Sequence, residues 1–129
     1  MSHLNKYDTC FINIKHLDTA LRRLGIPSDA IHRIDQDIMI KGVLTKKDKS
    51  IIFKWQGDHY RCYNDYENWI YPLSIESFTE RLNIAYATVQ AEDFSNQHGF
   101  RIESYITSED SGKYQSIKKY QLTTVRYNV

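Results

Sequence analysis

The chain has 129 residues, a length typical of a single folded domain. Hydrophobic residues make up 41% of it and charged residues 26%, which argues against an intrinsically disordered chain. Seventeen basic and sixteen acidic residues leave a net charge of +1, so the chain lacks the strong positive field of a typical nucleic-acid-binding protein. No apolar run reaches the ~20 residues that a membrane-spanning helix needs. We therefore expect one domain spanning residues 1–129.

The first two predicted elements are a strand and a helix. Leu4–Phe11 is expected to form the strand, and Asn13 to cap the helix, because its side-chain oxygen can accept the free N–H groups of the first turn. Gly25 and Pro27 end the helix, since glycine favours the turn after a helix and proline cannot continue one. The apolar residues at helical spacing are Ile14, Leu17, Leu21 and Leu24.

The middle of the chain predicts strands. Residues 28–36 show no clear pattern, whereas Asp37–Leu44 is expected to be a strand. Ser50–Trp55 and His59–Tyr66 are rich in β-favouring residues and are separated by a short turn that contains Gly57. These two segments form the clearest hairpin signal in the sequence.

A second helix and two strands complete the chain. Ser74 is the expected N-cap and Gly99 the expected stop. The apolar stripe of this helix consists of Phe78, Leu82, Ala85 and Val89. Phe100–Thr107 and Ile117–Tyr127 are the last predicted strands. The order β-α-β-β-β-α-β-β predicts a two-layer α+β sandwich, with a mostly antiparallel sheet of about five to six strands covered on one face by two helices.

Residues that commonly perform catalysis are present but are not arranged in a known motif. None of the five histidines has metal-ligand spacing, and the glycines are too scattered for a phosphate-binding loop. Cys10 and Cys62 are too far apart in sequence to suggest a disulfide framework, so we expect both to be reduced. Asp65 and Glu67 are expected to be solvated loop charges. The sequence therefore predicts no catalytic residue, no bound metal and no cofactor.

Aromatic residues are concentrated between residues 53 and 71, with Lys54 and Arg61 among them. Alternation along the two strands favours one buried face and one wet face, so most of these rings are expected to pack in the core. Those that remain exposed would suit a protein-binding surface, because Tyr and Trp are enriched at interfaces. Stacking of single-stranded RNA on the same hairpin is the alternative. The candidate interaction surface consists of Trp55, Tyr60, Arg61, Tyr63, Tyr66 and Trp69.

Several short patterns, in order along the chain, resemble one known family. They are Met1-Ser2-His3, then Leu17, Ala20-Leu21 and Leu24-Gly25, then Phe53-x-Trp55-x-Gly57-x-x-Tyr60, Asp65 and Trp69, then Ser74, Phe78, Tyr86-Ala87, Gly99-Phe100 and Val125-Arg126. Together they resemble the family of hypothetical chloroplast reading frame thirty-five, encoded in red-lineage algal plastids and in cyanobacteria. The stretch 28–50 and the residues directly after Ser2 depart from the family pattern.

The resemblance implies a location in the plastid stroma or the cyanobacterial cytoplasm, and it implies no catalytic residues. Synthesis in the plastid also fits the lack of a transit peptide in the sequence. We expect a non-catalytic accessory protein that acts through protein–protein contacts in maintaining or assembling a photosynthetic complex. A small RNA-binding module using residues 53–71, or a small enzyme with an unrecognised site, are the alternatives. The sequence identifies neither the partner nor the oligomeric state.

Overall fold

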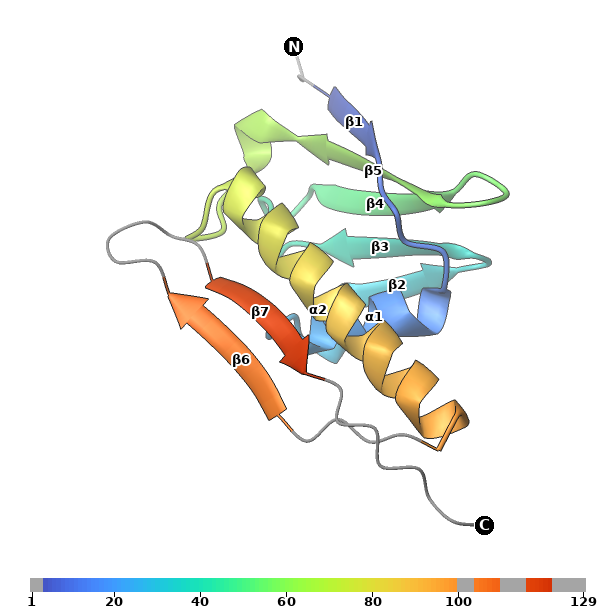
Figure 1. Cartoon of the computed structure of the whole chain (residues 1–129). Helices are drawn as coiled ribbons and strands as arrows, with labels where there is room; N and C mark the ends of the chain where they lie inside the picture. Colours follow the sequence, from blue (N-terminus) through green and yellow to red (C-terminus); the bar gives the residue numbers. More distant parts are fainter. Residues whose placement is uncertain (1–3, 100–103, 110–115, 122–129) are drawn as a thin grey trace.

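The computed structural model describes residues 4–99, 104–109 and 116–121 of the chain (Figure 1). The strands are β1 (Leu4–Asp8), β2 (Ile31–Ile34), β3 (Asp37–Lys41), β4 (Ser50–Trp55), β5 (Tyr60–Asp65), β6 (Ser104–Glu109) and β7 (Ser116–Gln121). The helices are α1 (Ile14–Arg23) and α2 (Ile75–Gln97), with short 3₁₀ turns η1 (Ser28–Ala30) and η2 (Tyr66–Asn68).

Five strands form one antiparallel sheet in the order β1-β5-β4-β3-β2. Both helices cover the same face of this sheet, so the predicted two-layer α+β architecture is confirmed (Figure 1). β6 and β7 pair with each other in a separate two-stranded sheet, and β7 lies beside α2 (Figure 1). Within the described part of the chain, β1 and β2 are therefore the two edges of the larger sheet.

The cap and the stop signal predicted for α1 are both present. The Asn13 side-chain oxygen accepts hydrogen bonds from the backbone N–H groups of Lys15 and His16 at 2.9 and 3.2 Å. Gly25 follows the helix with φ of 90°, a conformation that glycine adopts without steric cost. The apolar stripe points to the sheet and to α2, and its residues Leu17 and Leu21 are fully buried.

The helix α2 begins at its predicted cap, because the Ser74 hydroxyl accepts the Ser77 N–H at 3.1 Å. Its buried residues include Phe78, Leu82, Tyr86 and Val89. The Tyr86 hydroxyl accepts two hydrogen bonds, from the N–H groups of Ile12 and Asn13, at 3.0 and 3.1 Å. A side chain of α2 thus holds the backbone just before α1.

The region between α1 and β3 contains a strand that the sequence pattern does not reveal. Residues 28–36, which show no clear pattern, form η1 and β2. A two-residue turn joins β2 to β3, and Asp35 in this turn has φ of 55°. The strand expected over Asp37–Leu44 ends at Lys41, because Gly42 turns the chain with φ of 72°.

The core lies between the sheet and the helices. Strand residues alternate, so one side chain in two points to the helices. From β3, β4 and β5 these inward residues include Ile38, Ile40, Ile51, Phe53, Tyr60 and Cys62, all of them buried. Phe11, in the connection between β1 and α1, fills the space above them and packs on the Tyr86 ring at a centroid distance of 4.5 Å.

Candidate interaction surfaces

Two of the six candidate surface residues lie on the helix-covered side of the sheet. Tyr60 is 2% exposed, and its hydroxyl donates to the Gln36 carbonyl oxygen at 2.6 Å. Trp55 lies opposite Tyr60 on β4, is half-buried, and contacts the Tyr60 ring at a centroid distance of 4.9 Å. These rings therefore pack in the core and at its border, as the alternation of the hairpin favours.

Trp69 belongs to a second aromatic group, at the start of α2. Its ring centroid lies 5.5 Å from that of Phe78 and 6.0 Å from that of Tyr71. Its indole N–H donates to the Leu73 carbonyl oxygen at 2.7 Å. Trp69 thus fastens the loop before α2 to the helix. The side chain of Tyr66 lies outside the part of the structure that is described.

Tyr63 and Arg61, the remaining candidates, lie on the face of the sheet that the helices do not cover. The strand register places five outward residues in one row across all five strands. These residues are Lys6, Tyr63, Ile52, Met39 and His32. Lys54 and Arg61 lie in the next row. We call these seven residues the open face. Its middle, formed by Tyr63, Ile52 and Met39, is half-buried, and the two lysines are exposed.

An ionic cluster forms one corner of the open face. One oxygen of Asp8 accepts from the His59 Nε2 and the Arg61 Nε, both at 2.8 Å. The other ring nitrogen of His59, Nδ1, lies 2.6 Å from the Asp58 carboxylate. Both imidazole nitrogens can donate only when the ring is protonated. The cluster links β1 to β5 and to the turn before it.

Hydrogen bonds shift the titration of this cluster in the direction that stabilises its charges. The bonds from Arg61 and His59 lower the pKa of Asp8 below its ordinary value of 3.8. The bonds to Asp8 and Asp58 raise the pKa of His59 above its ordinary value of 6.5. The charged forms of Asp8, His59 and Arg61 therefore stabilise one another.

A groove lies on the other side of the sheet, between the edge strand β1 and the first half of α2. Its volume is about 400 Å³. The side chains that form it include Asn5 and Tyr7 from β1 and Glu76, Thr79, Glu80 and Asn83 from α2. The Tyr7 hydroxyl lies 3.3 Å from the Thr79 hydroxyl, and burial raises the pKa of Tyr7 well above its usual value of 10. Tyr7 therefore keeps its proton, and its hydroxyl lies beside Thr79 in the lining of a groove that also includes Glu76 and Glu80.

Within residues 4–99, several side chains that commonly carry chemistry have structural surroundings. No group of three or more His, Cys, Asp or Glu side chains there could hold a metal ion. Both cysteines are free, and burial raises the pKa of the Cys62 thiol to about 11, which disfavours a thiolate. His16 lies 2.7 Å from Asp93, a contact that joins α1 to α2. Asp65 accepts from the Glu67 N–H and the Asn68 side chain, and so shapes a turn.

The groove is the feature that sequence patterns do not reveal. Glu76 and Glu80 are one helical turn apart, which indicates a shared face of α2 but not what lies opposite. Tyr7 lies at an alternate position of β1 whose side chain points to the helices, as a core residue of a strand does. Only the pairing of β1 with β5 brings these two segments together. No local signal could therefore have identified the groove.

The fold and these surfaces define a small α+β protein with an antiparallel sheet covered by helices on one face. The chain belongs to the family described as "Protein of unknown function (DUF1257)", whose model matches residues 21–116. The uncharacterized protein ycf35 of Pyropia yezoensis is 26% identical to it over 123 residues, which cover 85% of this chain and 91% of that relative. No solved structure matches. The resemblance to hypothetical chloroplast reading frame thirty-five is thus confirmed. Among the described helices, none has the length and apolar character required to cross a bilayer.

Proposed function

We propose that the protein is a non-catalytic accessory protein that acts through protein–protein contacts made by the open face. One observation carries the proposal: both helices cover one face of the sheet, and no described element covers the other (Figure 1). The middle of that uncovered face is apolar, with Tyr63 beside Ile52 and Ile52 beside Met39. An apolar centre within a polar rim is the usual anatomy of a protein interface.

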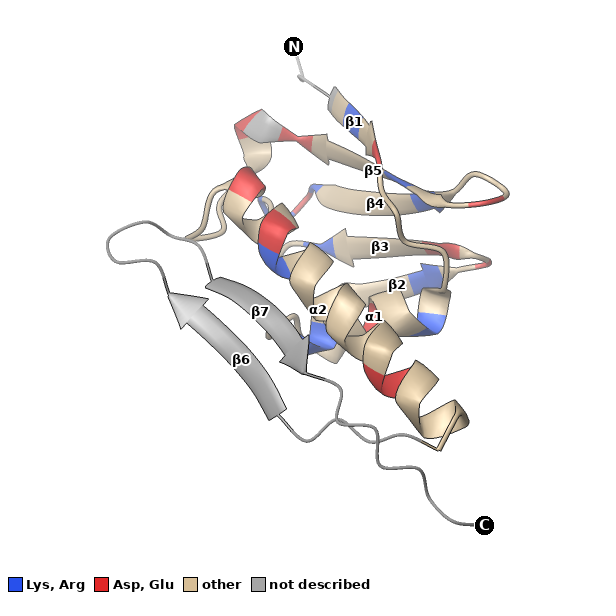
Figure 2. Ribbon diagram, in the orientation of Figure 1, with Lys and Arg blue, Asp and Glu red and all other residues tan. Residues whose placement is uncertain are grey.

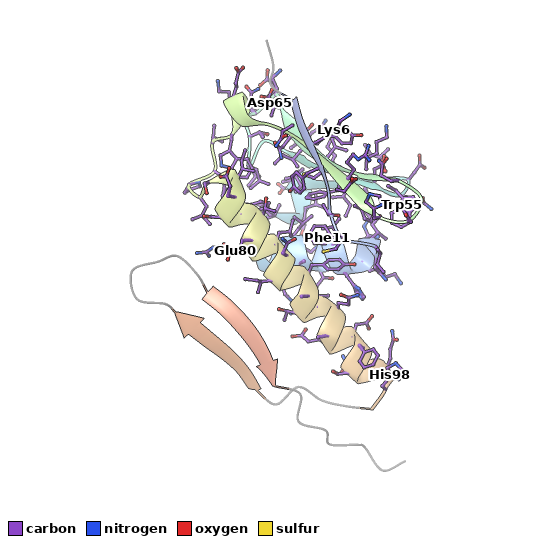
Figure 3. All side chains as sticks on the ribbon, turned by 45° about the horizontal axis from the view of Figure 1, so that its top comes forward. Lys6, Phe11, Trp55, Asp65, Glu80 and His98 are labelled. Carbon is purple, nitrogen blue, oxygen red and sulfur yellow. The ribbon has the colours of Figure 1, made fainter. Side chains whose placement is uncertain are left out.

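The rim of the open face indicates the kind of partner. Lys6 and Lys54 are exposed and form no ion pair among the described residues, and Arg61 is bound to Asp8. A partner with an apolar centre and an acidic rim would complement this surface, and opposite charges would speed its association. Figure 3 supports this surface: Lys6 lies on β1 at the side of the sheet away from α2.

The cellular role proposed here rests on the family. The relative from Pyropia yezoensis is named ycf35, which places it among hypothetical chloroplast reading frames. We assign the present chain to the plastid stroma or the cyanobacterial cytoplasm by analogy. Its proposed task is to maintain or assemble a photosynthetic complex, a task that needs a contact surface and no catalytic residue.

The test compares two matched variants of a tagged chain. Ile52→Thr/Tyr63→Thr replaces the apolar middle of the open face with β-favouring polar residues. Ile12→Thr/Ile70→Thr is the control, because both of these side chains are 55% exposed and lie outside the open face. We expect a stoichiometric partner that binds the parent and the control and binds the open-face variant at least tenfold more weakly. Equal retention by both variants, or a parent that binds no partner, would contradict the proposal.

Single-stranded RNA binding is the second candidate, because Tyr63 shares the open face with Lys54, Lys6 and Arg61. Base stacking on an aromatic ring and contacts between lysine and phosphate are the usual means of such binding. However, Tyr63 is the only described aromatic residue of the hairpin on this face, whereas sheet-based RNA readers stack two or three bases. Titration with a single-stranded RNA oligonucleotide at low and high salt tests this candidate. Binding that Tyr63→Ala leaves unchanged would exclude it.

A further inference from the structure

We propose that β1 binds an extended basic segment of another protein as an added antiparallel strand, with a Lys or Arg side chain placed in the groove beside Glu76 and Glu80. This proposal concerns a different surface from the open face and does not depend on it. It uses the free edge of the sheet, the groove and the charge of the groove.

On its outer side, β1 has backbone N–H and C=O groups that pair with no described strand. The Thr9 N–H donates to the Tyr60 carbonyl oxygen at 3.0 Å, and the Tyr60 N–H donates to the Phe11 carbonyl oxygen at 2.9 Å. In an antiparallel ladder every second residue bonds to the same neighbour. Asn5 and Tyr7 therefore bond to β5, while the N–H and C=O groups of Lys6 and Asp8 point away from the sheet.

The other side of β5 agrees with this assignment. Gln56 donates its N–H to the His59 carbonyl at 2.8 Å, so the alternate residues Arg61 and Tyr63 bond to β4. The residues between them bond to β1. Because β1 is an edge strand in the described structure, its outward groups are available to an added strand.

An added strand would place alternate side chains in the groove. A residue directly opposite another in an antiparallel pair points to the same face of the sheet. Residues opposite Lys6 would therefore point to the open face, and residues opposite Asn5 or Tyr7 would point to the groove. The groove of about 400 Å³ has room for one long side chain at that position.

The chemistry of the groove favours a cation. Glu76 and Glu80 are one turn apart on α2, are exposed, and form no ion pair among the described residues. Figure 2 shows the acidic residues in red at this end of α2. Like charges at this spacing repel each other and destabilise the helix, and a bound Lys or Arg would relieve that repulsion. The Tyr7 hydroxyl and the Asn83 amide add hydrogen-bonding groups.

The same edge disfavours a second copy of this chain as the occupant. In an antiparallel pair of two β1 strands, the residues with outward-pointing backbone groups lie opposite one another, so Lys6 and Asp8 would face Lys6 or Asp8 of the second copy. On the groove side, Asn5 and Tyr7 would then face only Asn5 or Tyr7 of the second copy. Neither groove would receive a cation. We therefore assign the edge to a different protein.

The probe is a synthetic peptide, acetyl-Thr-Lys-Thr-Lys-Thr-Lys-Thr-amide, in which lysines alternate with β-favouring threonines. When the peptide is titrated into the full chain, we expect the amide protons of Lys6 and Asp8 to gain at least tenfold protection from hydrogen exchange. The amide protons of Asn5 and Tyr7, which already bond to β5, should change little. A peptide with Glu in place of each Lys should not bind.

Two methylated peptides test the strand pairing itself. The threonines would lie opposite residues whose backbone groups point outward, so N-methylation of the threonine amides should weaken binding at least tenfold. N-methylation of the lysine amides, which would point to solvent, should leave most of the affinity. Equal affinities of the two methylated peptides would overturn strand addition, and loss confined to the lysine-methylated peptide would overturn the antiparallel sense.

Protein variants test the groove. Glu76→Gln/Glu80→Gln should weaken binding of the lysine peptide at least tenfold. Asp29→Asn/Asp48→Asn is the matched control, because it removes the same charge at two exposed residues outside the groove. Equal weakening by both variants would show that the net charge of the protein alone causes the effect, and would overturn the proposal.

One further variant separates this site from the open face. Lys6→Pro removes an N–H that points outward and leaves the bonds between β1 and β5 intact. It should abolish peptide binding. Ile52→Thr/Tyr63→Thr should leave peptide binding unchanged. The proposal for the open face and the proposal for the β1 edge can therefore be refuted separately. A β1 edge blocked by self-association would appear as a dimer in sedimentation and would also overturn the proposal.

Discussion

The two faces of the five-stranded sheet have opposite surroundings: the helices cover one, and no described element covers the other. Neighbouring residues of one strand belong to different faces, so the same backbone supports both. On the covered face, Phe53 and Tyr60 are 1% and 2% exposed. On the open face, their neighbours Ile52 and Arg61 are half-buried and contact no helix. The covered face therefore stabilises the fold, whereas no described element packs on the open face.

The largest expected effect tests this difference directly. Phe53→Ala should lower the free energy of unfolding by about 3–5 kcal/mol, because it leaves a cavity in the core. Ile52→Ala, one residue earlier on β4, should cost only about 1 kcal/mol, because that side chain already contacts water. Denaturant unfolding of both variants gives the comparison. Equal losses would show that an element covers the open face in solution.

The next largest effect is expected where the Tyr86 hydroxyl of α2 accepts hydrogen bonds from the backbone just before α1. Tyr86→Phe removes the acceptor for the N–H groups of Ile12 and Asn13, and should cost about 1–3 kcal/mol in the same measurement. The control is Tyr63→Phe on the half-buried open face, where the hydroxyl has Arg61 as its neighbour and its loss should change stability by less than about 0.5 kcal/mol. A negligible effect of Tyr86→Phe would mean that water replaces the hydroxyl.

A smaller effect is expected at the start of α1. Asn13→Ala removes the side-chain acceptor of two backbone N–H groups and should cost about 1 kcal/mol. Asn13→Asp keeps a capping oxygen and should be nearly neutral, which separates the cap from other effects of the substitution. If both variants lose the same stability, the cap is not the cause.

The smallest effect is a pH dependence at the corner of the open face. The pKa of His59 is raised, so the stability that His59 contributes is complete below pH 6.5 and is lost as pH rises through its folded pKa. The pKa of Asp8 is lowered, so its contribution is present above pH 3.8 and is lost as pH falls through its folded pKa. Unfolding midpoints measured from pH 5 to 9 should fall less steeply in His59→Gln than in the parent. An unchanged slope would exclude His59 as the source.

Much of the fold could be predicted from the sequence because its signals are local. The cap at Asn13, the stop at Gly25 and the apolar stripe of α1 lie within one short segment, and the structure confirms them. The hairpin of β4 and β5 is equally local. The strand β2 was missed because only its first residue, Ile31, is buried, so its pattern lacks the alternation of a half-buried strand. Its turn is also unmarked, since Asp35 rather than glycine adopts the positive φ.

The surfaces could be predicted only in part, for a different reason. The sequence identifies the aromatic hairpin but not which face the helices cover. That choice buries Tyr60 and leaves Tyr63 outward, although the two residues have similar chemistry. Figure 3 shows how far apart the ends of this hairpin lie, with Trp55 near its turn and Asp65 near the start of α2. The groove depends on contacts between β1 and α2, which no local pattern encodes.

The place of β1 in the sheet also determines the order in which the chain can assemble. β1 is synthesised first, yet its partner β5 ends at Asp65, so it must wait for about half of the chain. β2 to β5, by contrast, follow one another along the chain and pair with their neighbours, which favours fast folding. Pulsed hydrogen exchange during refolding should therefore protect the amides of β3 and β4 before those of β1. The edge proposed to receive a partner strand is then the last edge of the sheet to form.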